Sequence, residues 1–288
     1  MSPFLQSCME WLRTQPFSII RLSEIYQDGE PVTLECQKVS ACQNVYSVAK
    51  LFTATAIGLL WDEGKLRLDE KICDILQGEL PEAGMDPRWY EATVERALTH
   101  RLGLPGGFLD IDVQPSVSFT QDFLRYLLTY PLAYEPGTQE RYSDGAFYLL
   151  ARIAEKKAGM PLDHYLWPRL LWPMQFQEMA WSHCPMGHVI GATGLYIHSA
   201  DMAKLGALYL HDGIYHGQRL LSREWIQLAF SRSFALDWDD QHRICYKGGM
   251  HGQKLILAPE QGRVVAMQAF GANSQIVAEW VRDYGAKP

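Results

Sequence analysis

The sequence predicts an α/β (α+β) protein in which one antiparallel sheet is assembled from both ends of the chain. Runs that suit β-strands lie near the two ends, and helical patterns separated by Pro and Gly turns lie between them. We expect helices to flank the sheet. An inserted, mainly helical lobe, residues 65–189, should form a cleft with the sheet lobe, residues 1–64 and 190–288. With 288 residues, 48% of them hydrophobic, the chain can bury the core of one such domain.

The N-terminal elements follow from spacing and turn chemistry. Residues 3–14 carry apolar side chains at helical spacing, and Pro16 ends that pattern. Residues 17–39 then read as two strands joined at Asp28-Gly29, a dipeptide suited to a tight hairpin. From Ser47, the segment SVAKLFTATAIGLLWDEGKL predicts a long helix that ends near Gly64. Because this helix is apolar nearly all round, it should be buried.

The rest of the chain alternates helices and turns before it returns to strands. The expected helices span residues 90–99, 120–129, 144–158, 162–171, 200–212, 222–230 and 274–284. The expected strands are RICYKGG and QKLILAPE, joined by a short turn at residues 250–252, followed by VVAMQAF. These C-terminal strands should complete the sheet that begins near the N-terminus.

Composition excludes several classes of protein. A net charge of −7 without a Lys/Arg cluster argues against a nucleic-acid partner, because such binding rests on neutralising phosphates. No apolar run approaches the roughly 18 residues that span a bilayer, and the segment MSPFLQSCMEWLRTQPF lacks the features of a signal peptide. Six scattered cysteines without a C-x-x-C pair suggest reduced thiols. We therefore expect a cytoplasmic protein with no membrane partner.

Ser47 and Lys50 form an S-x-x-K motif at the start of the predicted buried helix. Their i, i+3 spacing puts the hydroxyl and the ammonium on one face, and a helix start favours developing negative charge. The motif alone occurs about once by chance in a chain of this length, given average Ser and Lys usage. The ordinary alternative is a Ser N-cap followed by a surface lysine. A helix this apolar instead predicts a partly buried Lys50, whose desolvation would make it a better base.

A second group of polar residues lies in EPGTQERYSDGAFYLLARIAEKKAG. Its Pro-Gly turn delivers Tyr142, Ser143 and Asp144 to the start of a helix. A tyrosine relays a proton only if a nearby cation favours its phenolate, which Lys50 could do. The alternative is that Ser143 or Asp144 caps the helix beside a packing tyrosine.

Five segments resemble, in order, the serine β-lactamase-related family of class C β-lactamases, D-aminopeptidases and esterases, which is similar to penicillin-binding proteins. They are SVAKLFTATAIGLLWDEGKLRLDEKI, LTHRLGLPG, EPGTQERYSDGAFYLLARIAEKKAG, GATGLYIHSADMAKLGALYL and GQKLILAPEQGRVVAM. The resemblance covers about residues 17–270 and implies a β-lactamase/transpeptidase-like fold. It also implies an acyl-enzyme at Ser47 and proton handling by Lys50 and Tyr142, without a cofactor. Which of these two is the general base stays open.

Two departures from the family pattern matter. The usual Y-x-N becomes Tyr142-Ser143-Asp144, so a carboxylate replaces an amide that would hold substrate and lysine. This anion would raise the pKa of Lys50 and weaken it as a base, unless Asp144 points outward. The T-H-T-S-G-L-P signature is altered at residues 99–105, a loop that should support the fold more than the chemistry.

The third motif of the family has two candidate registers. Lys247-Gly248-Gly249 fits a K-T-G motif, with Met250 supplying a backbone N–H that pairs with that of Ser47 as an oxyanion hole. The competing register uses His251-Gly252. A further alternative is that Lys247 merely faces solvent on an edge strand.

Other chemistry is disfavoured. The sequence has neither H-E-x-x-H nor G-x-x-x-x-G-K-[ST], and His183, Cys184 and His188 lack a partner pair at ligand spacing. We expect no metal. Asp110 and Asp112 should be solvated acids in a turn.

The sequence thus predicts a serine hydrolase that forms an acyl-enzyme at Ser47 on a small amide or ester. The alternative within this class is a penicillin-binding carboxypeptidase or β-lactamase. The alternative from another class is a non-catalytic sensor or structural protein, which Asp144 and the blurred third motif favour and which Ser47, Lys50 and Tyr142 oppose. The sequence makes no prediction of the oligomeric state.

Overall fold

The computed structural model describes residues 1–115 and 118–285 of the chain. The chain divides into two compact units. The sheet unit comprises residues 1–48, 172–180 and 195–288, and the helical unit comprises residues 49–171 and 181–194.

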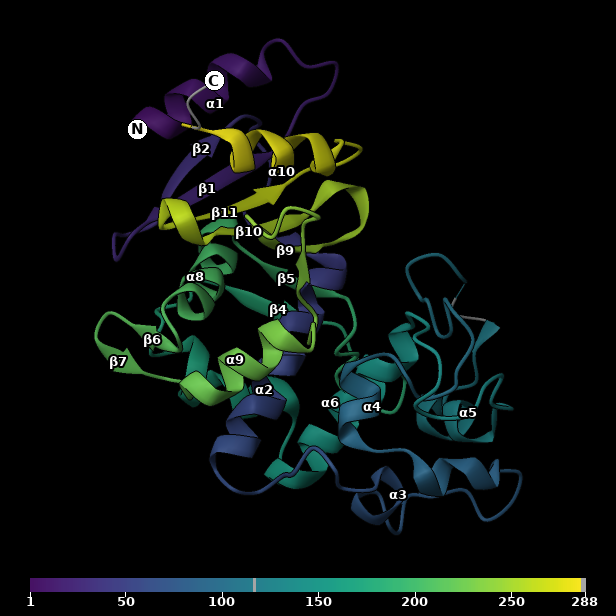
Figure 1. The fold of residues 1–288 in the computed structure, drawn as a ribbon. Helices are drawn as coiled ribbons and strands as arrows, with labels where there is room; N and C mark the ends of the chain where they lie inside the picture. Colours follow the sequence, from purple (N-terminus) through teal and green to yellow (C-terminus); the bar gives the residue numbers. More distant parts are fainter. Residues whose placement is uncertain (116–117, 286–288) are drawn as a thin grey trace. The chain divides into compact units, whose positions relative to one another are not determined.

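The sheet unit is built on a six-stranded sheet with strand order β2-β1-β11-β10-β9-β8. Its strands are β1 (Arg21–Tyr26), β2 (Val32–Glu35), β8 (Asp237–Trp238), β9 (Cys245–Gly248), β10 (Lys254–Ala258) and β11 (Arg263–Gln268). Every neighbouring pair is antiparallel, and β1 lies beside β11 (Figure 1). In this pair Arg21 lies opposite Gln268. This pairing of the first strand with the last confirms the predicted fold class.

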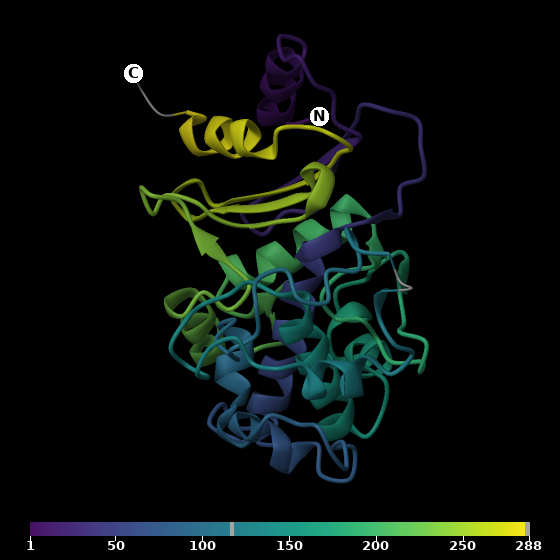
Figure 2. The same ribbon diagram turned by 90° about the vertical axis from the view of Figure 1, so that its right-hand side faces the viewer.

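Both faces of this sheet are covered by helices, which is why β10 and β11 are buried along their whole length. Helices α1 (Pro3–Leu12) and α10 (Ser274–Asp283) pack on one face, where Phe4 and Val281 share a core with Val265. Helix α8 (Ser199–Leu210) packs on the other face (Figure 2). A Cβ at Gly206 would lie 2.6 Å from Val264, so the helix backbone approaches the sheet closely.

The remaining elements of the sheet unit are short. A three-stranded sheet has the order β3-β5-β4, and a hairpin joins β6 and β7. Their bounds, with α9, are β3 (Gln43–Asn44), β4 (Met179–Trp181), β5 (Leu195–Ile197), β6 (Ile214–Tyr215), β7 (Gln218–Arg219) and α9 (Arg223–Ser231). Strands of two or three residues are too short to show an alternating pattern in a sequence, and β3 to β7 were not predicted.

The helical unit is organised around α2, which packs against α6 and α7. Its elements are α2 (Ala49–Asp62), α3 (Ile72–Ile75), a 3₁₀ turn (Pro87–Glu91), α4 (Val94–Leu98), α5 (Phe123–Thr129), α6 (Asp144–Ala158), α7 (Leu162–Leu166) and a π turn (Trp167–Leu171). Every residue of α2 from Ala49 to Leu60 is buried, as its apolar sequence predicted. The sequence-based division placed residues 49–64 with the sheet, whereas their contacts group α2 with the helices; the lobe boundaries remain a prediction.

In the described part of the chain, no helix combines the length and the apolar character needed to cross a bilayer.

Candidate active site

Ser47 lies in a 3₁₀ turn, Tyr46–Val48, which leads directly into α2. The chain turns sharply at Tyr46, whose φ of +48° is uncommon for a residue with a side chain. The side chain of Asn44 holds this turn, because its Oδ1 accepts a hydrogen bond of 2.8 Å from the Tyr46 amide. Ser47 is half-buried. The α-helix itself begins two residues later than the sequence predicted.

Lys50 lies on the first turn of α2 and is fully buried, with 0% of its surface exposed. Its ammonium donates 2.7 Å to Oδ1 of Asp144 and 3.0 Å to the carbonyl oxygen of Ala192. The ring centroid of Tyr142 lies 4.8 Å from Nζ, and the two side chains are hydrogen-bonded. The structure therefore brings together three of the predicted site residues, and Lys50 is not a surface lysine.

The pKa of Lys50 reflects two opposed influences. Burial, the largest single influence, lowers it, but the charges and hydrogen bonds of Asp144 and Tyr142 together raise the pKa above its ordinary value. Asp144 points inward, which is the condition under which the sequence predicted a weaker base. Lys50 is accordingly an ammonium at neutral pH, and it acts on its neighbours as a fixed positive charge.

The loop at residues 99–105 holds the turn that carries Tyr142. The His100 ring lies 4.5 Å from the Tyr142 ring, and His100 Nδ1 accepts from the Ser143 amide at 3.3 Å. The Gly107 amide donates to the carbonyl oxygen of Tyr142 at 2.8 Å. This agrees with the expected supporting role of the loop. It also identifies His100, which sequence reasoning did not single out, as a residue that positions Tyr142.

The two candidate helix caps at the start of α6 have different roles. Ser143 is the N-cap, and its hydroxyl accepts from the Ala146 amide. Asp144 instead directs its carboxylate to Lys50, in a pair of which 0% and 7% of the side chains are exposed. A carboxylate so deeply buried requires such a partner, because an unpaired buried charge is strongly destabilising.

Two further acids lie beside this pair. Oxygen atoms of Asp110, Asp112 and Asp144 lie within 4.8 Å of one another. Asp112 accepts a 2.5 Å hydrogen bond from the buried hydroxyl of Thr193. Burial raises the pKa of Asp112, the Thr193 bond lowers it, the neighbouring carboxylates raise it and Lys50 lowers it, with a net increase. The expectation of a solvated turn acid is therefore wrong for Asp112.

These three carboxylates are the described residues whose spacing would suit a divalent cation. The ammonium of Lys50 already neutralises Asp144. The three residues that the sequence analysis considered and disfavoured as metal ligands bond to or face other groups. His183 faces Asp163 at 3.8 Å, the Tyr148 hydroxyl donates to Cys184, and His188 bonds to Glu155.

The third motif lies in the sheet unit, at the end of β9. Lys247 is buried and sits opposite Leu255, and β9 lies between β8 and β10. The alternative of a solvent-facing lysine on an edge strand is therefore wrong. A Cβ at Gly249 would clash with the carbonyl oxygen of Val45, so glycine is required where this strand approaches the turn before Ser47.

His251 also lies near that turn. It has a φ of +61°, its ring stacks on Phe270 at 4.4 Å, and it meets the Tyr46 ring edge-on at 5.2 Å. The Gly249 backbone and the His251 side chain thus both adjoin the turn that carries Ser47. Both registers of the third motif stay open.

A family model described as Beta-lactamase matches residues 40–275. The chain belongs to the beta-lactamase family. This membership confirms the predicted resemblance and the predicted class of enzyme, a serine hydrolase. The match spans the S-x-x-K turn, the tyrosine turn and the third motif.

Curated relatives of this beta-lactamase-family chain include penicillin-binding proteins. "Penicillin-binding protein 4" of Amycolatopsis lactamdurans is 26% identical over 273 residues, which cover 78% of this chain and 71% of that protein. A "Putative D-alanyl-D-alanine carboxypeptidase" of Escherichia coli is 24% identical, over 65% of this chain and 55% of that protein. The matched region is 32% of the Bacillus subtilis "N-acetylmuramyl-L-alanine amidase". The matched region thus makes up between about a third and about 70% of the length of each of these relatives.

Solved structures share the fold at low identity. The "Putative 6-aminohexanoate-dimer hydrolase from Bacillus anthracis" has a TM-score of 0.78 at 16% identity, over 97% of this chain and 80% of that one. A "D-stereospecific amidohydrolase from Streptomyces sp." has a TM-score of 0.68 at 18% identity, over 98% of each chain. These similarities confirm the predicted β-lactamase/transpeptidase-like fold.

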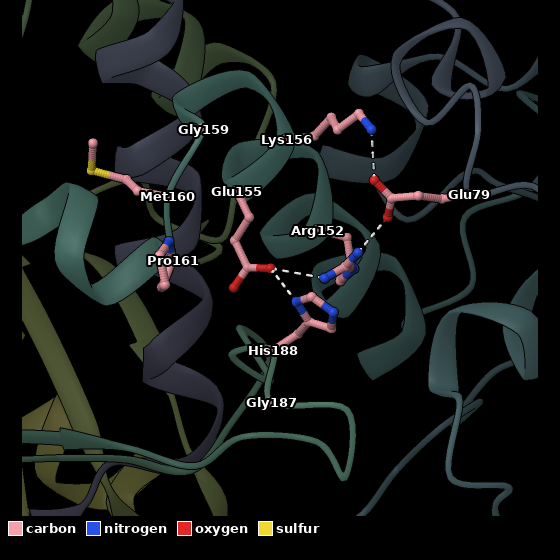
Figure 3. Close-up of a pocket in the computed structure, with 9 residues that line it drawn as sticks. All are labelled: Glu79, Arg152, Glu155, Lys156, Gly159, Met160, Pro161, Gly187 and His188. Carbon is pink, nitrogen blue, oxygen red and sulfur yellow. Dashed lines mark hydrogen bonds and ion pairs between the residues drawn. The ribbon is translucent and has the colours of Figure 1, made fainter.

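A cavity of about 370 Å³ in the helical unit of this beta-lactamase-family chain has a lining that does not include Lys50; Arg152, Glu155 and His188 are among its lining residues (Figure 3). It sits at the C-terminal end of α6, about three helical turns from Asp144. Its charged side chains are paired: Arg152 binds Glu79 and Glu155, and Glu155 binds His188 at 2.8 Å. This network ties α6 to the segment that carries Ala192, and we interpret it as structural.

Proposed function

We propose that the chain hydrolyses a small amide or ester through an acyl-enzyme at Ser47. One observation carries the proposal: Lys50 is buried three residues after Ser47, bonded to Asp144 and Tyr142. Burying a lysine charge is costly unless it is paired and hydrogen-bonded, and such buried, paired groups are concentrated at functional sites. Here the ammonium favours the phenolate form of Tyr142.

Tyr142 rather than Lys50 serves as the general base in this proposal, because Asp144 keeps Lys50 protonated. The phenolate of Tyr142 takes the hydroxyl proton of Ser47 while Oγ bonds to the carbonyl carbon of the substrate. When the tetrahedral intermediate collapses, the bond to the leaving group breaks and Tyr142 returns the proton to it. Water then attacks the acyl-enzyme by the same route, and Ser47 is regenerated as the acid product leaves.

The oxyanion would be held by backbone amides of the sheet unit. The Gly249 amide already donates to the carbonyl oxygen of Gln253 at 2.8 Å, so the proposed donors are the amides of Ser47 and Met250. Lys247, or His251 in the other register, would bind the substrate. No cofactor is required for these steps.

An amide or ester without a negative charge is the proposed substrate. Asp110 and Asp112 place two further carboxylates beside Asp144, the carboxylate that pairs with the ammonium of Lys50. A substrate carboxylate would be repelled there. The names of the amidohydrolase and dimer hydrolase with this fold favour an amide.

A penicillin-binding carboxypeptidase or β-lactamase is the second candidate, and the names of the curated relatives favour it. Hydrolysis of p-nitrophenyl acetate and of a chromogenic cephalosporin separates the two candidates, with the Ser47→Ala variant as control. The proposal expects ester hydrolysis that the variant loses, and slow or absent cephalosporin turnover. Hydrolysis of neither compound by the wild type, with no acylation by either, would favour the non-catalytic alternative.

The cytoplasmic location expected from the sequence forms part of this proposal, and cell fractionation tests it. The substrate is the proposed partner; neither nucleic acid nor a membrane is required.

A further inference from the structure

A second cavity of the helical unit has a volume of about 690 Å³. Residues from three segments line it: Ile111; Phe119, Thr120, Gln121 and Phe123; and Ser182, His183, Pro185 and Ile190. Its apolar lining includes Phe119 and Phe123 from one wall and Ile190 from another. The volume and the lining are typical of pockets that bind small organic molecules, which are mostly apolar and about 300–1,000 Å³ in size.

Two walls of this cavity lead directly to the groups around Lys50. Ile111 precedes Asp112, whose carboxylate lies within 4.8 Å of the carboxylate that binds the lysine. Ile190 lies two residues before Ala192, whose carbonyl oxygen accepts from Lys50 at 3.0 Å. Two of the segments that line the cavity therefore continue, within one or two residues, into the groups around Lys50.

The lining specifies an uncharged ligand. Among the described residues that form the walls there is no lysine or arginine, so a carboxylate would find no counterion. Polar side chains such as Gln121, Ser182 and His183 can hydrogen-bond a neutral group, and the imidazole of His183 is directed towards Asp163 at 3.8 Å. An apolar chain or ring with at most one neutral polar group fits this surface.

We propose that this cavity binds an uncharged apolar portion of the substrate, either on its acyl side or on its leaving-group side. This inference rests on the proposed function, because it assigns a substrate class to the site at Lys50. It distinguishes a hydrolase of medium-chain or aromatic amides and esters from one that acts on acetyl or charged peptide groups.

The test uses two series of uncharged substrates with the full chain. One series varies the acyl group from two to eight carbons with a fixed leaving group, and the other varies the amine of an acetamide over the same lengths. Each CH₂ that enters the cavity should raise kcat/KM about fourfold until the cavity is full. One series should show this increase, and its identity assigns the side of the substrate.

The variant Gln121→Trp fills the cavity from an exposed position and should remove the dependence on chain length. Gln114→Trp makes the same change at an exposed position outside the lining and should preserve it. Equal values of kcat/KM across both series, or unchanged chain-length dependence in Gln121→Trp, would overturn the inference while leaving the proposed hydrolase intact.

A binding measurement tests the cavity as a ligand site independently of whether the chain is a hydrolase. Saturation-transfer NMR detects N-phenylhexanamide on the Ser47→Ala variant, which cannot be acylated. Gln121→Trp and Gln114→Trp are each added to this variant. Binding that is lost with Gln121→Trp and kept with Gln114→Trp supports the cavity as the binding site, even if the wild type hydrolyses nothing. Binding that is absent, or equal in both variants, contradicts it.

Discussion

The buried pair of Lys50 and Asp144 allows a quantitative prediction for Asp144→Asn. The change removes a carboxylate 2.7 Å from the ammonium in a site where the two side chains are 0% and 7% exposed. Removing one partner of a buried pair costs about 3–5 kcal/mol. Because asparagine still offers an oxygen to Lys50, we expect the free energy of unfolding to fall by about 3 kcal/mol at pH 7.

The loss of stability in Asp144→Asn should also depend on pH. The folded state raises the pKa of Lys50, so its charged form stabilises the fold below the unfolded value of about 10.4, and this stability is lost as pH rises through the folded pKa. Without the carboxylate, burial lowers the pKa of Lys50 in the variant, so the difference between wild type and variant should be largest near neutral pH and shrink as the pH rises through that lowered pKa. Urea denaturation followed by circular dichroism measures it. Asp110→Asn, a carboxylate nearby that is not bonded to Lys50 in the described contacts, is the matched control.

The same variant tests which residue is the general base. If Lys50 works as an ammonium, its lower pKa in Asp144→Asn should move the alkaline limb of the kcat/KM profile to lower pH and leave neutral activity no higher. If Lys50 is the base, freeing it from the carboxylate should raise activity at neutral pH and move the acid limb down. A higher kcat/KM at neutral pH would refute the role of Lys50 as a fixed charge. A loss of less than about 0.5 kcal/mol in the free energy of unfolding, the range typical of a surface substitution, would refute the buried pair.

Three other predictions follow from the site. Tyr142→Phe should lower kcat by about 10²–10⁴ through loss of a general base, with unchanged circular dichroism, while Tyr90→Phe at an exposed position should leave kcat as it is; equal rates would exclude Tyr142. His100→Ala should lower kcat about tenfold with KM little changed, because the Tyr142 ring loses its contact, and a change in KM alone would argue against this positioning role. Gly249→Ala should lower the melting temperature or the rate of acylation, because its Cβ would clash with the carbonyl oxygen of Val45. Gly248→Ala is the control, because a Cβ there meets no atom within 4 Å. Equal melting temperatures and acylation rates in the two variants would contradict the close approach at Gly249.

The sequence predicted the elements whose patterns are long. The burial of α2 and the at least partial burial of Lys50 followed from fourteen residues with almost no polar face. The assembly of one sheet from both ends of the chain followed from strand-like runs at both ends, although the pairing of β1 with β11 was not specified. The turn that carries Tyr142 was marked by its Pro-Gly dipeptide. These signals are local, so a single sequence contains them.

The direction of the Asp144 side chain was not predictable in the same way. A residue at the start of a helix can face solvent as a cap or turn inward, and the choice depends on Lys50, which lies 94 positions earlier in the chain. The pairing of Asp112 with Thr193 joins two loops with no periodic pattern. Such contacts arise from tertiary packing, and spacing within one segment does not encode them.

The nucleophilic role of Ser47 is the central claim, and intact-mass spectrometry tests it most directly. The full chain and Ser47→Ala are each incubated with a fluorophosphonate and, separately, with a penicillin. The account predicts a single phosphonyl adduct on the wild type that the variant lacks, with little or no penicilloyl adduct. The absence of a phosphonyl adduct on the wild type, or an adduct that survives in Ser47→Ala, would contradict it.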